Sequence, residues 1–313
     1  MEEEIFISGR NIPNIDPNLE VWHFPISLYL FLGGMAAGII FFASLFTILK
    51  KEKEVPTAVK GAMLVAFIGI IIGLIALMYD LTHLLYVWQL YMTVRIESPM
   101  SWGAWVLLII SLLTFLWVFS YSNEMFPKWD WKFDFIKDFQ AFIIKNRRTM
   151  AMIMLPLAVI LGVYTGILLS AFNARPLWNN SILGPLFLTS GLSTGAAAII
   201  LFSKNHFEKI VFTKIDLALI ILELGLIIHM LMGMAAGSTV QLEALDILVG
   251  GEFTVMFFGF VIILGLIFPA IMEGVELLGF KVPSVVPALL ILMGGFIFRM
   301  VMVEAGQLTR YLY

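Results

Sequence analysis

The chain has 313 residues, of which 61% are hydrophobic and only 13% are charged. A soluble domain carries about 25% charged residues, so this composition predicts an integral membrane protein whose surroundings are the lipid bilayer. There is no cysteine, which excludes disulfides, thiolate metal sites and cysteine-ligated iron–sulfur clusters, and a net charge of −3 does not predict a nucleic-acid partner.

Eight apolar segments reach the length of about 20 residues that crosses the hydrocarbon core of a bilayer. The sequence therefore predicts an all-α fold with eight transmembrane helices in a single membrane domain over residues 1–313. The predicted spans are 25–49, 60–84, 102–121, 149–172, 182–203, 211–236, 252–272 and 283–303.

One loop predicts a further helix that does not cross the membrane. Between the third and fourth spans, at about 131–144, apolar residues recur at helical spacing with lysines and aspartates on the other side: Phe135, Ile136, Phe139, Phe142 and Ile143. This pattern is typical of an amphipathic helix that lies on the cytoplasmic membrane surface.

The distribution of positive charge predicts the orientation of the spans. The loops after spans 1, 3, 5 and 7 hold most of the 19 lysines and arginines, whereas the other loops and the termini hold only Arg10, Arg95, Arg175 and Arg310. Cytoplasmic loops are enriched in Lys and Arg. The sequence thus predicts a multi-pass protein of the cytoplasmic (inner) membrane with both termini on the outer, periplasmic or extracellular, side.

Polar residues of several spans fall in the outer half of the membrane in this orientation. Asp80 and His83 end span 2, and a helix that continued through both would place them on nearly the same side. Arg299 lies in the outer third of span 8. Ionisable groups at such depth are costly, so we interpret them as candidate functional residues, with hydrogen-bonded packing as the competing interpretation.

Span 6 carries a second set of candidates, Asp216, Glu223 and His229. Asp216 and Glu223 are seven residues apart and share one helical face, whereas His229 falls on a different face. They predict either a proton path from the cytoplasm or, for Glu223, a protonated carboxyl that bonds a neighbouring helix. Glu273 and Glu276, at the end of span 7, are expected to be solvated.

The histidines do not predict a haem relay. Of His23, His83, His206 and His229, only His83 and His229 lie at depths where they could pair as axial ligands. We therefore expect that this chain binds neither haem nor a metal ion.

Several stretches resemble the NrfD/PsrC-like membrane subunits of polysulfide reductase and related quinone-linked oxidoreductases. They are "VWHFPISLYLFLGGMAAG" (21–38), "MYDLTHL" (78–84), "ESPMSWGAW" (97–105), "YTGILLSAFNARPLWNN" (164–180) and "PLFLTSGLSTGAA" (185–197). They occur in family order over about the first two thirds of the chain. A separate internal similarity links "FLGGMAAG" (31–38) to "LTSGLSTG" (188–195), although "GMAAG" recurs at 233–237, as ordinary small-residue helix packing would produce.

The resemblance implies two four-helix bundles and a site for a quinone, menaquinone or ubiquinone, near the outer face. It implies electron exchange with a ferredoxin-like iron–sulfur subunit docked outside, and through it with a molybdopterin catalytic subunit or a multihaem cytochrome. In the family, an inward polar residue of the first span and the tyrosine of the YTG motif lie near the quinone. These positions match Tyr29 and Tyr164, and some relatives have histidine at the first.

Quinone chemistry moves two protons with two electrons, so the site needs hydrogen-bonding groups and a proton acceptor. His83 can serve both purposes, Asp80 can orient it, and Tyr29 and Tyr86 can offer hydroxyls and ring faces. We predict an enzyme subunit, quinone-reactive within an oxidoreductase complex. Two alternatives remain open, namely a proton or ion transporter that uses Asp216, Glu223 and His229, and a purely structural membrane anchor.

Overall fold

The computed structural model describes residues 22–81, 83–128 and 131–309. Within these ranges every regular element is helical, and eight helices are long and apolar enough to cross a membrane. They are α2 (Phe24–Ile48), η1 with α3 (Thr57–Gly61, Ala62–Asp80), α5 (Pro99–Ser120), α8 (Arg147–Ser170), α9 (Leu183–Phe202), α10 (His206–Ala235), η3 with α12 (Val255–Ile267, Phe268–Leu277) and α13 (Val285–Leu308). The all-α fold with eight spans is thus confirmed.

Short helices lie in the connections: η2 (Leu84–Tyr86), α4 (Trp88–Met92), α6 (Ser122–Met125), α7 (Asp134–Lys145) and α11 (Thr239–Val249). Helix α7 lies where the amphipathic helix was predicted, with Phe135, Phe139 and Phe142 exposed. Its position on a membrane surface remains a prediction, as does the location of the chain ends, which fall outside the described residues.

Three spans differ from their predicted bounds in ways that affect the candidate sites. The second ends at Asp80 rather than at 84, because Leu81 adopts an extended conformation with ψ of 123°. The sixth begins at His206 rather than at 211, and the seventh continues to Leu277 rather than ending at 272. Glu273 therefore lies inside a span, and His83 lies outside one.

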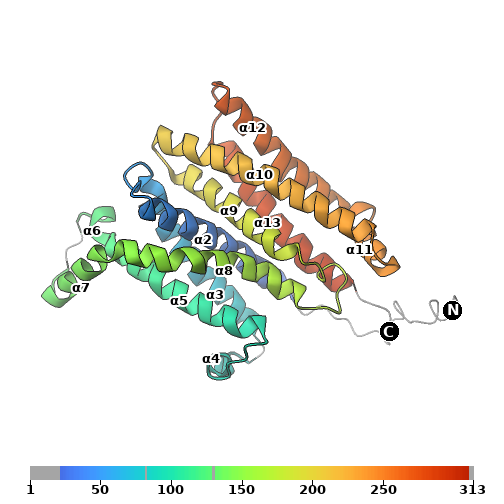
Figure 1. Cartoon of the computed structure of the whole chain (residues 1–313), viewed down its shortest axis with the longest axis horizontal. Helices are drawn as coiled ribbons and strands as arrows, with labels where there is room; N and C mark the ends of the chain where they lie inside the picture. Colours follow the sequence, from blue (N-terminus) through green and yellow to red (C-terminus); the bar gives the residue numbers. More distant parts are fainter. Residues whose placement is uncertain (1–21, 82, 129–130, 310–313) are drawn as a thin grey trace.

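Helices α2 and α9 occupy the centre of the molecule (Figure 1). Helix α2 packs against α3, α8, α9 and α13, and α9 also packs against α8, α10 and α13. In the most apolar stretch of α2, 78% of the residues are buried, compared with 28% for α10 and for η3 with α12. The outer helices thus have a large exposed face, which suits contact with lipid.

Glycines bring α2 and α9 into backbone contact. A Cβ atom added to Gly191 would lie 2.8 Å from the carbonyl oxygen of Gly34, and one added to Gly195 would lie 2.7 Å from the carbonyl carbon of Gly38. Small residues four apart permit such close helix crossings. The similar stretches 31–38 and 188–195 therefore pack against each other, whereas Gly233 in the third copy has no neighbour within 4 Å of such a Cβ.

A carboxylate joins the beginning of α10 to the beginning of the second span. Glu208 is fully buried, and its Oε1 accepts a hydrogen bond from the Ala58 backbone N–H at 2.8 Å, while its Oε2 accepts one from Ser203 Oγ at 2.7 Å. A negative group is favourable at a helix N-terminus, where backbone N–H groups lack partners. Both oxygens of this buried carboxylate are therefore satisfied.

At the same end of the molecule, Arg147 connects α8 to α5. Its guanidinium lies 3.4 Å from the centroid of the Tyr121 ring, donates from Nε to Ser120 Oγ at 2.9 Å and forms an ion pair with Glu124 at 3.5 Å. Burial is the main reason that the pKa of Tyr121 lies above its ordinary value. The phenol is thus neutral near pH 7, and Arg147 stacks on an uncharged ring.

Candidate functional site

A ladder of buried polar side chains lies between α9 and α10. Ser193 Oγ donates a hydrogen bond of 2.6 Å to Asp216 Oδ1, and the Ser190 hydroxyl lies within hydrogen-bonding reach of Glu223. The two helices run antiparallel, so Ser193, the later of the two serines, faces Asp216, the earlier of the two carboxyls. All four side chains are at most 2% exposed.

Arg299 of α13 joins the ladder at its Ser190–Glu223 end. Its guanidinium is fully buried, and Nη1 donates to Ser190 Oγ at 2.5 Å and to the Gly295 carbonyl at 3.0 Å. Nη2 donates to the Phe187 carbonyl at 3.3 Å. The Ser190 hydroxyl accepts from Arg299 and is free to donate to Glu223, so it is placed to link a buried cation with a buried carboxyl.

Glu273 of α12 joins the ladder at its Ser193–Asp216 end. It is 1% exposed, and it lies within hydrogen-bonding reach of Asp216. The expectation that Glu273 is solvated was wrong, because the seventh span extends beyond it to Leu277.

His229 does not join this ladder. It lies on the exposed face of α10, whereas the buried face of that helix carries Asp216, Glu223, Ile227 and Met230. The described contacts therefore bring together two of the three span-6 candidates.

Two of the predicted quinone contacts converge in the interior. Tyr29 of α2 and Tyr164 of α8 are 5% and 4% exposed, and they lie close enough to interact electrostatically, as do Tyr29 and Tyr91. Gly103 of α5 faces Tyr164, and a Cβ atom there would lie 2.7 Å from Cδ2 of the ring. Tyr29 thus has two other phenols within electrostatic range near the N-terminal end of α2.

The remaining predicted contacts lie at the periphery. Asp80 is the last residue of α3 and interacts electrostatically with His23, which precedes α2. His83 is exposed, and its ring makes an edge contact with Tyr86, with centroids 6.2 Å apart. Because α3 ends at Asp80, His83 does not lie one helical turn beyond Asp80 on the same face. The structure therefore places the His83–Tyr86 pair outside the buried phenol group.

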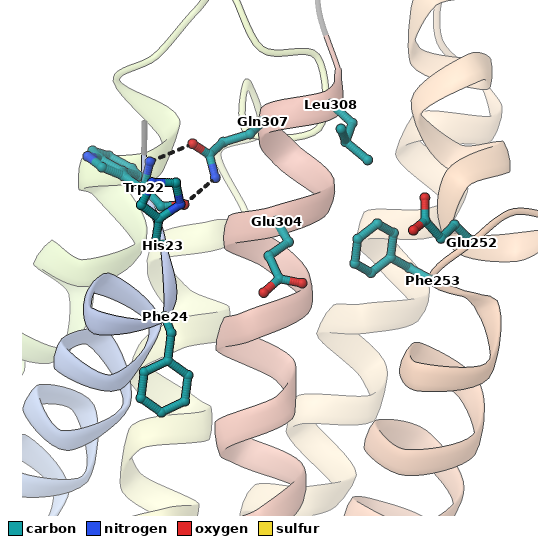
Figure 2. A pocket seen from close by; sticks show the side chains of 8 residues that line it. All are labelled: Trp22, His23, Phe24, Glu252, Phe253, Glu304, Gln307 and Leu308. Carbon is teal, nitrogen blue, oxygen red and sulfur yellow. Dashed lines mark hydrogen bonds between the residues drawn. The ribbon is translucent and has the colours of Figure 1, made fainter. Parts of the chain in front are cut away.

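A cavity of about 390 Å³ opens at this end of the molecule between α2, α13 and the start of η3. Figure 2 shows Trp22, whose backbone N–H and carbonyl both bond the Gln307 side chain at 2.7 Å, with Glu252 and Glu304 among the other lining residues. The phenols do not line it. Its walls come from residues 22–24, 252–253 and 304–308, and no sequence pattern links these segments.

The buried tyrosines are hydrogen-bond donors rather than metal ligands of the usual kind. Within residues 22–81, 83–128 and 131–309, no three His, Asp or Glu side chains are grouped as metal ligands. The Tyr29 and Tyr164 hydroxyls, set among apolar helices, can each donate a hydrogen bond to a quinone oxygen.

Sequence reasoning did not identify Ser190, Ser193 and Glu273 as site residues. Both serines occur in "LTSGLSTG", a stretch whose glycines alone suggested a role. A hydroxyl in an apolar helix usually bonds its own backbone, so the sequence does not reveal which serine faces a carboxyl on another helix.

Comparison with known proteins gives three relatives and one family model. Residues 13–310 match the family described as "Polysulphide reductase, NrfD". The chain is 30% identical to Protein NrfD of Escherichia coli (strain K12) over 92% of this chain and 96% of that protein. It is 31% identical to the C subunit of polysulfide reductase from Wolinella succinogenes, over 93% and 95%, and 29% identical to the Protein NrfD homolog of Haemophilus influenzae, over 95% and 98%.

Proposed function

The chain belongs to the polysulphide reductase NrfD family, and we propose from this that it is the quinone-reactive subunit of its complex. As a member of this family, the chain is a multi-pass membrane subunit of a respiratory oxidoreductase. In the proposal, electrons pass between a membrane quinone and an iron–sulfur subunit outside, with a molybdopterin subunit or a multihaem cytochrome beyond.

The observation that carries this proposal is the convergence of Tyr29 and Tyr164 from separate spans. Each phenol is buried, and both lie in the half of the molecule where α2 begins and α8 ends. A hydroxyl in such an apolar setting donates a strong hydrogen bond to a quinone oxygen, which acquires charge as it is reduced. The structural-anchor alternative gives no reason to bury two phenols within electrostatic range of each other.

The test is Tyr164→Phe, which removes one hydroxyl and keeps the ring. We expect quinone-linked turnover of the purified complex to fall on the order of 10²-fold, the usual effect of one lost donor to a developing negative charge. The matched control is Tyr121→Phe, which removes another buried hydroxyl at the opposite end of the molecule and is expected to leave turnover unchanged. Unchanged turnover in an assembled Tyr164→Phe complex would remove Tyr164 from the proposed site.

We propose that the iron–sulfur partner docks at the end of the molecule where α2 begins, over loops 85–101, 173–181 and 237–251. Apolar side chains are exposed there, with Leu85 at 86% and Ile96 at 87%. The loop 173–181 offers less surface than the sequence suggested, because Leu177 and Trp178 are buried and Trp178 Nε1 bonds the Met302 carbonyl at 2.6 Å.

The absence of cysteine makes this docking testable by site-specific crosslinking in the intact complex. We expect Leu85→Cys and Ile96→Cys to crosslink to the iron–sulfur subunit with a short bifunctional reagent. Phe135→Cys, at an exposed position of α7 at the other end, is the control that is expected not to react with it. Crosslinking mainly from position 135 would place the partner on the opposite face.

We also propose that Asp216 and Glu223 carry protons between the end of the molecule with the basic loops and the quinone site. Ser193 and Ser190 each connect to one of these carboxyls, which shortens the gaps that the sequence left between them. His229 is left out of the path because it lies on the exposed face of α10.

A further inference from the structure

Glu273 and Asp216 form a pair of buried carboxyls with too few donors. Among the described residues, neither Glu273 oxygen accepts a hydrogen bond, and Asp216 Oδ2 accepts none, while Asp216 Oδ1 accepts from Ser193. Helices α10 and α12 pack together and place the two carboxyls within hydrogen-bonding reach of each other. Buried polar groups are normally satisfied, so this arrangement requires an explanation.

The charged surroundings of the pair are acidic. Within the described part of the chain, the other charged groups that act on these two carboxyls are Glu223 on α10 and Glu276 on α12. Helix α9 contributes only the Ser193 hydroxyl. Two ionised carboxylates in contact in a medium of low dielectric constant repel strongly, and pairs of this kind hold one proton between them.

We propose that Asp216 and Glu273 share one proton and form the carboxyl dyad through which protons enter the path to Glu223. The shared proton turns the contact into a short O–H···O⁻ hydrogen bond, which satisfies one orphaned oxygen on each side chain. The transport part of this inference rests on the proton path proposed above, whereas the shared proton depends only on the geometry of the pair.

The dyad has a route to the surface. Glu276 lies one helical turn beyond Glu273, is partly exposed and interacts with Lys209 and His206 near the start of α10. On the same buried face of α10, Thr213 lies one turn before Asp216, and its hydroxyl has no partner among the described residues. When Glu273 takes up a proton from Glu276, Asp216 releases the shared one through the Ser193 hydroxyl, and Glu223 is the carboxylate that accepts it. The dyad then again holds one proton.

The first test is infrared spectroscopy of the purified complex, which detects the C=O stretch of a protonated carboxyl and its shift in D₂O. We expect Glu273→Gln and Asp216→Asn each to remove the same protonated-carboxyl band. The matched control is Glu208→Gln, because Glu208 is equally buried but both of its oxygens already accept hydrogen bonds. That substitution is expected to leave the band in place.

Two spectroscopic results would overturn the dyad. One is a spectrum in which no protonated-carboxyl band depends on Glu273. The other is a band that disappears when Na⁺ is added at constant pH, since this would identify the pair as a site for a monovalent cation instead of a proton.

The second test measures proton movement per electron in sealed vesicles that contain the complex. We expect Glu273→Gln to abolish that movement while quinone-linked electron transfer continues. Unchanged proton movement in this variant would overturn the transport role of the dyad. If the wild-type complex moves no protons, the proposed path fails, and the infrared result still decides whether the pair shares a proton.

Discussion

Replacing Gly191 by leucine is expected to prevent the chain from reaching a folded state in the membrane. The backbones of α2 and α9 touch at this position, where even a Cβ atom would lie 2.8 Å from the Gly34 carbonyl oxygen. Overpacking a core usually costs about 1–3 kcal/mol when side chains can move aside. Here the obstacle is backbone, so the two most buried helices must separate, and we expect the loss to exceed that range.

The measurement is the yield of monodisperse protein after detergent extraction, followed by fluorescence size-exclusion chromatography. Gly233→Leu is the matched control, because Gly233 belongs to the same kind of small-residue motif but has no atom within 4 Å of an added Cβ. We expect the control to retain the wild-type yield. A normal yield of Gly191→Leu would show that the contact between α2 and α9 is looser than described.

The same glycines show what sequence can and cannot predict about this fold. Hydropathy identified all eight spans, because the bilayer requires about 20 apolar residues from each helix. The similarity of 31–38 to 188–195 was also visible in the sequence. A small-residue motif shows which face of a helix permits close approach, but it does not name the partner helix, and a third copy at 233–237 made all three look equivalent.

The candidate site shows a similar division. The seven-residue spacing predicted that Asp216 and Glu223 share a face, and both lie on the buried face of α10. Glu273 was predicted to be solvated because a carboxylate at the end of an apolar segment usually marks the point where the helix leaves the membrane. The predicted position of His83 assumed a helix that continues past Asp80, whereas α3 ends there. Backbone conformation at a helix end is the feature that sequence predicts least well.

Arg299→Leu is expected to destabilise the protein severely although leucine fits the apolar surroundings. The guanidinium is fully buried and donates to Ser190 Oγ and to the Gly295 and Phe187 carbonyls. Its loss leaves the buried Glu223 carboxyl without the positive charge that acts on it. Leaving a buried charge uncompensated costs about 3–5 kcal/mol, and we expect an effect of this size in thermal or SDS-induced unfolding of the detergent-solubilised protein.

Arg299→Lys separates the geometry of the guanidinium from its charge. Lysine keeps the positive charge but cannot present donors in two fixed directions, so we expect an intermediate loss of stability. Stability equal to wild type in Arg299→Lys would mean that charge alone accounts for the role of Arg299.

The double variant Arg299→Leu with Glu223→Gln decides whether the cost lies in the orphaned carboxyl or in the lost hydrogen bonds. Glutamine cannot ionise, and it can still bond the Ser190 hydroxyl, so no uncompensated charge remains in the interior. If Glu223 and Arg299 are coupled through Ser190, the double variant should be more stable than Arg299→Leu alone, with a coupling energy in the range of about 0.5–3 kcal/mol found for residues in one network. Strictly additive effects would show that Ser190 does not connect the two residues. Arg299 and Glu223 would then each contact Ser190 without being energetically coupled.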